Sequence, residues 1–159
     1  MLNYRIVVGF DGSEGGVRAL DWAVAEAARR GGAVHAVSAW QWTQPELGVD
    51  IRVEHEKLAV QALDDAVAVA RRAHPDVTVS TEVAAGPAAE LLTRATADAD
   101  LLVLGSHGHS RLFHAVLGSV TEACIRLSAC PVVVIPVPAS VSQPTEPATT
   151  APPVSTAVY

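Results

Sequence analysis

The chain has 159 residues, of which half are hydrophobic and 18% are charged, values typical of one folded domain. Its formal net charge is −6 and it holds no run of Lys or Arg, so we expect neither nucleic acid nor a membrane surface as a partner. No apolar stretch approaches the ~20 residues that a membrane-spanning helix needs. The opening MLNYRIVVGFDGS has no signal-peptide pattern, which favours a cytoplasmic location.

Five short apolar runs predict β-strands. They cover Tyr4–Gly9, Ala33–Trp40, Val77–Ala84, Asp100–Gly105 and Pro131–Pro136. The first, fourth and fifth runs are continuously apolar, as strands covered on both faces are. In the third run, Val77, Val79, Thr81 and Val83 alternate with polar residues, which predicts a half-exposed strand at a sheet edge.

Four segments of helical period separate these runs. The residues expected on the buried faces are Val17, Leu20, Val24 and Ala27, then Leu63, Val67 and Ala70, then Ala88, Leu91, Leu92 and Ala95, then Val116, Val120, Ala123 and Leu127. The second helix is expected to begin near Ile51. This alternation predicts an α/β domain, an open parallel five-stranded sheet with right-handed crossovers and helices on both faces.

The end of the chain differs in composition. Residues 138–159 are rich in Pro, Thr and Ser and hold one charged side chain, Glu146. Such a segment buries too little apolar surface to offset its ordering entropy, so we expect a disordered tail after a folded domain of residues 1–137. Cys124 and Cys130 fit no zinc or disulfide pattern, and we expect two small hydrophobic side chains.

Two strand ends carry glycine-rich sequence. The first predicted strand runs into Gly9-Phe10-Asp11-Gly12-Ser13, and the fourth runs into GSHGHSRLFHAVLGS, from Gly105 to Ser119. Ligands of open parallel sheets bind beyond the carboxyl ends of the strands, so these loops are the candidate site.

The second loop has the spacing G-x2-G-x9-G-S, with glycines at 105, 108 and 118. Glycines allow backbone N–H groups to converge on an anion, and Gly118-Ser119 opens a helix whose first N–H groups favour a negative charge. Arg111 is placed to clamp a phosphate. The loop therefore predicts a nucleotide-phosphate site.

Structural readings of the same residues stay open. Ser119 and Glu122 form a capping box, so Ser119 can be an N-cap as well as a ligand contact. Arg111 can be a solvated surface residue. Asp11 can cap the first helix, or it can meet a ribose hydroxyl or a magnesium ion.

Other nucleotide motifs are absent. A P-loop needs a lysine after its second glycine, and Lys57, the one lysine, lies in the second helical segment. The first loop lacks the G-x-G-x-x-G of a dinucleotide site, and a receiver domain would need an acidic cluster where Asp11 stands alone. A metal site is suggested by three histidines, His107, His109 and His114. No Cys, Asp or Glu lies near them in sequence, so we favour the interpretation that these histidines line a phosphate site.

Taken together, these segments resemble the universal stress protein family, in its ATP-binding branch. The resemblance covers about residues 4–137 and rests on IVVGFDGS, AVSAW, Gly86-Pro87, LLVLGSHG, LGSV and ACPVVVIP. It implies a Rossmann-like sheet of order 3-2-1-4-5, often paired through the last strand into a homodimer.

The resemblance also implies where an adenine nucleotide would lie. The adenine would lie near Gly9, Phe10, Asp11 and Ala39, and the ribose and phosphates near Gly105, Ser106, His107, Gly108, His109, Ser110, Arg111, Gly118, Ser119 and Val120. Many ATP-binding members have glycine where Ser110 stands, which leaves ADP or AMP as alternatives to ATP. The function implied is ATP-binding regulation in a stress response rather than catalysis. The alternative is a slow ATPase or nucleotide hydrolase that uses magnesium held near Asp11.

Overall fold

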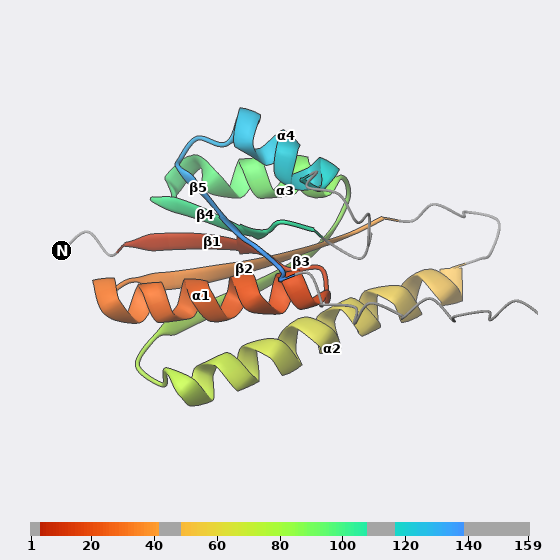
Figure 1. The fold of residues 1–159 in the computed structure, drawn as a ribbon. Coiled ribbons are helices and arrows are strands. Elements are labelled where there is room, and N and C mark those ends of the chain that lie inside the picture. Colours follow the sequence, from red (N-terminus) through yellow and green to blue (C-terminus); the bar gives the residue numbers. More distant parts are fainter. Residues whose placement is uncertain (1–3, 42–48, 108–116, 139–159) are drawn as a thin grey trace, which may run out of the picture.

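The computed structural model describes residues 4–41, 49–107 and 117–138. The elements in chain order are β1 (Arg5–Gly9), α1 (Glu14–Arg30), β2 (Ala33–Trp40), α2 (Val49–Ala73), β3 (Thr78–Ala85), α3 (Ala88–Ala95), the 3₁₀ turn η2 (Thr96–Asp98), β4 (Leu101–Gly105), α4 (Ser119–Leu127) and β5 (Val132–Ile135) (Figure 1). The five predicted strands are confirmed, and each end lies within one residue of its predicted position.

The strands form one parallel sheet of order β3-β2-β1-β4-β5. Helices α1 and α2 cover one face, and α3 and α4 cover the other (Figure 1). The predicted Rossmann-like α/β fold and its strand order are therefore confirmed. The strand order reverses between β1 and β4, and in such sheets the crevice for a ligand opens at this point.

Alternate residues of each strand supply the two halves of the core. Ile6 and Val8 of β1 pack with Leu20 and Val24 of α1, whereas Val7 packs on the opposite face. At the β3 edge Val77 and Val79 are buried and Ser80 and Glu82 are exposed, which confirms a half-exposed edge strand. Thr81, which was expected on the buried face, is exposed.

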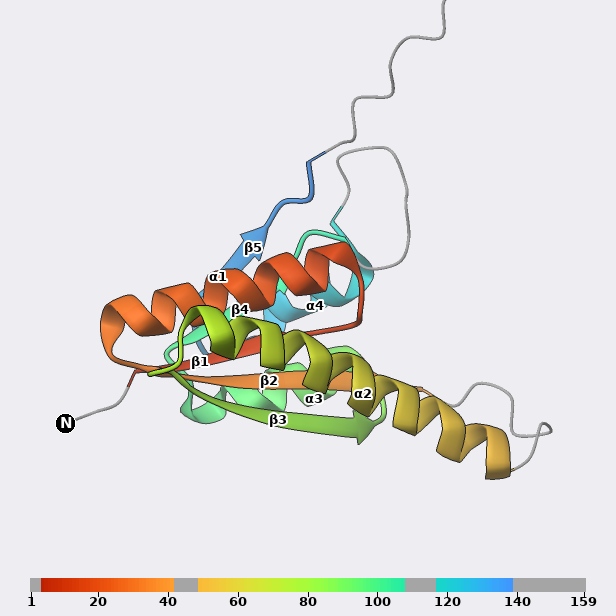
Figure 2. The same ribbon diagram turned by 90° about the horizontal axis from the view of Figure 1, so that it is seen from below.

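The predicted faces of the first two helices are largely correct. Leu20, Val24 and Ala27 of α1 are fully buried, as are Leu63, Val67 and Ala70 of α2, but Val17 is 39% exposed. The N-terminal half of α2 extends past the strands, and its residues 52–58 are exposed (Figure 2).

The buried face predicted for the fourth helix is wrong. Val120 and Leu127 are 37% and 66% exposed, and the residues that α4 buries are Thr121 and Cys124. The helix takes this rotation because the Thr121 hydroxyl donates to the Gly105 carbonyl oxygen at 2.9 Å, while Cys124 packs among apolar side chains of β4 and β5. Val116, the first residue of the predicted stripe, lies outside the described residues.

Both cysteines are free thiols, and Cys124 is buried as expected while Cys130 is partly buried. Burial raises the pKa of the Cys124 thiol, which keeps it protonated and unreactive. Within the described residues, no helix is long and apolar enough to cross a bilayer. The tail beyond Pro138 lies outside the described residues, so its disorder stays a prediction.

Candidate functional site

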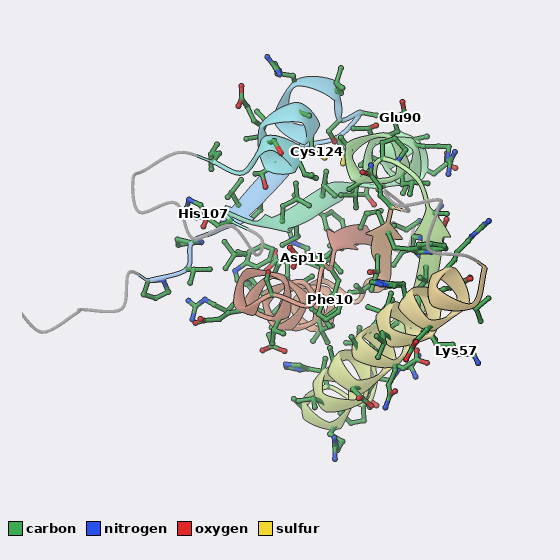
Figure 3. All side chains as sticks on the ribbon, turned by 90° about the vertical axis from the view of Figure 1, so that its right-hand side faces the viewer. Phe10, Asp11, Lys57, Glu90, His107 and Cys124 are labelled. Carbon is green, nitrogen blue, oxygen red and sulfur yellow. The ribbon has the colours of Figure 1, made fainter. Side chains whose placement is uncertain are left out.

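A cavity of about 230 Å³ opens at the carboxyl ends of β1 and β4, where the strand order reverses. Its lining combines the two glycine-rich strand ends with the first turns of α3 and α4. The lining residues are Gly9, Phe10, Asp11, Gly16, Val37, Ala39, Ala88, Leu92, Leu104, Gly105, His107, Gly118, Ser119, Val120 and Thr121. In the view onto the strand ends, Asp11 and His107 lie between α1 and α4 (Figure 3).

The turn after β1 is fixed by Asp11 and Ser13. The Phe10 N–H donates to the Val37 carbonyl oxygen at 2.9 Å, which continues the sheet by one bond. Oδ1 of Asp11 accepts hydrogen bonds from the backbone N–H and the hydroxyl of Ser13. The Ser13 hydroxyl oxygen in turn accepts from the Gly16 N–H, so Ser13 is the N-cap of α1. Asp11 thus supports the cap through Ser13 and also lines the cavity.

This cap yields a stability prediction. Ser13→Ala removes the acceptor for the Gly16 N–H and is expected to cost about 1 kcal/mol of folding free energy. In a domain of this size that loss lowers the melting temperature by roughly 2–4 °C. Ser13→Thr keeps the hydroxyl and is the matched control in thermal denaturation. Equal melting temperatures for the Ala variant and the wild type would show that the cap contributes nothing.

The end of β4 is tied to α4 by the backbone of Ser106. Its N–H donates to the Ile135 carbonyl oxygen at 2.9 Å, and its carbonyl oxygen accepts from the Gly118 N–H at 3.0 Å. These bonds place Gly118, rather than Ser119, at the N-cap position, and α4 begins at Ser119. The predicted capping box is therefore wrong, because Ser119 is the first residue of the helix and Gly118 holds the N-cap position.

The uncapped helix start is the feature of the cavity best suited to an anion. Gly118, Ser119, Val120 and Thr121 all line the cavity, and among the residues that the structure describes no side chain caps this helix start. Such N–H groups and the positive end of the helix dipole favour a phosphate or carboxylate.

His107 lies on the same wall of the cavity. Its Nδ1 is 3.0 Å from the Ser106 hydroxyl oxygen. Its Nε2 is buried and has no hydrogen-bond partner among the residues that the structure describes. Ser106 is itself buried and does not line the cavity, and its hydroxyl oxygen also accepts from the Val137 N–H at 3.3 Å.

The opposite part of the cavity is apolar. Val37 and Ala39 of β2, Leu92 of α3 and Leu104 of β4 supply its walls. An apolar wall beside a cluster of N–H donors suits a ligand with a flat apolar part and an anionic part.

Nine of the fourteen predicted site residues line this one cavity, Ser106 stands behind it, and Gly108, His109, Ser110 and Arg111 lie outside the described residues. Sequence reasoning missed the apolar walls because Val37, Leu92 and Leu104 have the pattern of core residues. Val37 could have been predicted, because it lies two residues before Ala39 and so faces the same side of its strand.

No group of three or more His, Cys, Asp or Glu side chains within the described ranges is placed to hold a metal. His109 and His114, two of the histidines considered as metal ligands, lie outside these ranges.

The strand order and the cavity at the reversal point define an open α/β domain of the doubly wound class. The model of the universal stress protein family matches residues 3–136. The chain belongs to the universal stress protein family. One curated relative, a universal stress protein of Mycobacterium tuberculosis, is 37% identical over 131 residues, which cover 81% of this chain and 44% of the relative.

Two solved structures are similar over almost their whole length. A universal stress protein in complex with cAMP is 26% identical, with a TM-score of 0.63, and the match covers 84% of this chain and 96% of that one. A protein of the same family from Burkholderia pseudomallei is 28% identical, with a TM-score of 0.64 and the same coverage. The chain spans about half the length of the curated relatives it matches.

Proposed function

We propose that this chain binds an adenine nucleotide, with ATP as the main ligand, and acts as a regulatory protein in a stress response. The observation that carries the proposal is the cavity that joins the uncapped start of α4 to the end of β1. The adenine lies against Gly9, Phe10, Asp11 and Ala39, and the phosphates lie at the start of α4. ADP and AMP present the same adenine and first phosphate to these groups.

The apolar walls and the helix start support this orientation. A purine buried against Val37, Leu92 and Leu104 removes apolar surface from water, while the phosphate oxygens accept from the N–H groups of Ser119 and Val120. The similar universal stress protein that holds cAMP is consistent with an adenine nucleotide in this chain. Arg111 and the glycine at 108 are proposed to complete the phosphate contacts.

Thermal denaturation of protein purified without nucleotide tests the proposal. A ligand at one hundred times its dissociation constant stabilises the folded state by about 2.7 kcal/mol. Because each kcal/mol moves the melting temperature of such a domain by roughly 2–4 °C, MgATP is expected to raise it by about 5–10 °C. GTP is expected to raise it less, since the backbone near Asp11 and Ala39 reads the adenine edge. No shift with ATP, ADP or AMP would contradict nucleotide binding.

Slow ATP hydrolysis with magnesium near Asp11 is the second candidate function. The observation that favours it is the carboxylate of Asp11 on the cavity wall. Asp11 is the one carboxylate among the described lining residues, and its Oδ1 holds the Ser13 cap. Nucleotide binding without catalytic turnover therefore has the stronger support.

We also propose a cytoplasmic location. The two free thiols accord with the reducing environment of the cytosol.

We also propose that the chain forms a homodimer through β5. On the side of β5 away from β4, no strand of the described chain pairs with it, and its residues are partly exposed. Ile125 and Leu127 of α4 add exposed apolar surface. An open apolar edge favours pairing with a second copy across a two-fold axis.

Light scattering at about tens of micromolar is expected to give the mass of a dimer. Val134→Lys places a charge on the edge strand and is expected to give a monomer. Leu58→Lys, on the exposed part of α2, is the control and is expected to remain a dimer. A wild-type monomer, or a dimer that Val134→Lys leaves intact, would exclude this interface.

A further inference from the structure

The hydrogen bonds around Ser106 decide which nitrogen of His107 carries the proton. The Ser106 hydroxyl has one hydrogen to donate and two lone pairs that accept. It accepts from the Val137 N–H and lies 3.0 Å from Nδ1 of His107. If the hydroxyl donates to Nδ1, the neutral ring carries its proton on Nε2.

The opposite assignment leaves more polar atoms unpaired. With the proton on Nδ1, the Ser106 hydroxyl hydrogen has no acceptor in the described part of the chain, and Nε2 is a buried acceptor without a donor there. With the proton on Nε2, the Nε2–H group alone lacks a partner. Each unpaired buried polar atom destabilises the folded state, so the smaller number of unpaired atoms favours the Nε2–H form.

We propose that the hydrogen bond from Ser106 to Nδ1 places the His107 proton on Nε2, and that this N–H group donates to the nucleotide phosphate closest to the ribose. The assignment rests on the proposed nucleotide binding and adds a side-chain contact to the backbone groups of α4. His107 lines the cavity together with Ser119 and Val120, whose backbone N–H groups at the start of α4 attract an anion, so we assign the acceptor of His107 to the same ligand group. That group is a phosphate oxygen, because every neighbouring donor on this wall favours an anion.

A comparison of AMP with adenosine isolates the contribution of the phosphate contact to binding affinity, because the two ligands differ only in the phosphate. His107→Asn keeps a polar atom near Ser106 but has none at the position of Nε2. It is expected to weaken AMP binding about tenfold or more, the usual loss for a hydrogen bond to a charged group, and to leave adenosine binding within about twofold. His107→Gln places an amide nitrogen as many bonds from Cα as Nε2, and it is expected to restore most of the AMP affinity.

The tautomer is measurable without any ligand. In the full chain with ¹⁵N-labelled histidine, long-range proton–nitrogen NMR spectra distinguish a protonated ring nitrogen from an unprotonated one. We expect Nε2 of His107 to be protonated in the wild type, and Ser106→Ala to give a mixture of tautomers. AMP is expected to shift the Nε2 resonance, whereas adenosine is not. If His107 had a structural role alone, AMP would not shift this resonance.

Three outcomes would overturn the proposal. These are a proton on Nδ1 in the wild type, equal losses of AMP and adenosine affinity in His107→Asn, or AMP binding that leaves the Nε2 resonance unchanged. Each of these results would leave the proposed nucleotide binding intact. A wild-type protein that binds neither AMP nor ATP would overturn the proposed function, and the phosphate contact with it.

Discussion

Gly118→Val is expected to abolish the stabilisation by ATP and AMP while the unliganded protein stays folded. A Cβ atom at position 118 would lie 3.6 Å from the Ser106 carbonyl oxygen, an ordinary contact, and the backbone angles of Gly118 suit any residue. Gly118 lines the cavity, so the added methyl groups are expected to take space at the wall where the phosphate is proposed to lie. Valine is also a poorer N-cap than glycine, so we expect a loss of about 1 kcal/mol in the apo protein.

Thermal denaturation with and without nucleotide measures both effects. Ala62→Val adds the same β-branched side chain at an exposed position of α2, and it is expected to keep the full nucleotide shift. A Gly118→Val protein that retains the shift would show that the nucleotide does not contact the start of α4. Circular dichroism of the apo variant excludes simple unfolding as the cause of a lost shift.

Gly105→Ala is expected to give the largest loss of stability among small substitutions at the site. Its Cβ would lie 2.8 Å from the carbonyl carbon and oxygen of Gly15, in the first turn of α1. Backbone atoms cannot rotate away as a side chain can, so α1 or β4 must shift. Overpacking of this kind costs about 1–3 kcal/mol, and Gly105→Val is expected to exceed that range.

Gly118→Ala is the matched control for this effect, because it adds the same atom where 3.6 Å is available. We expect it to remain within about 1 kcal/mol of the wild type in urea denaturation, and Gly105→Ala to unfold at clearly lower urea concentration. Equal midpoints for the two variants would mean that α1 and β4 do not meet at these glycines.

The strands and the position of the site could be predicted from the sequence because their signals are local. A run such as IVVG is apolar whatever surrounds it, and glycines at a strand end predict a close backbone approach. The rotation of α4 could not be predicted, because Val120, Cys124 and Leu127 are all apolar and the sequence does not show which of them is buried. The bond from Thr121 to Gly105, between residues far apart in the chain, turns Cys124 inward.

The two open readings of Asp11 also needed the structure. A carboxylate near a helix start predicts a cap, but Ser13, two residues later, holds the cap position and leaves Asp11 at the cavity wall. The apolar walls were missed for a different reason. Leu92 packs in the core and borders the cavity at once, and no sequence pattern separates these roles.

Ser106 connects the proposed nucleotide site with the proposed dimer edge. Its carbonyl oxygen accepts a hydrogen bond from the N–H of Gly118, just before α4, and its N–H donates to the carbonyl oxygen of Ile135 in the edge strand β5. A nucleotide that draws the cap toward its phosphate would therefore strain or relax the edge where the second copy is proposed to pair. Linkage makes such an effect reciprocal. If nucleotide binding changed the affinity of the dimer by some factor, dimerisation would change the affinity for the nucleotide by the same factor. The nucleotide concentration needed for binding would then depend on the protein concentration.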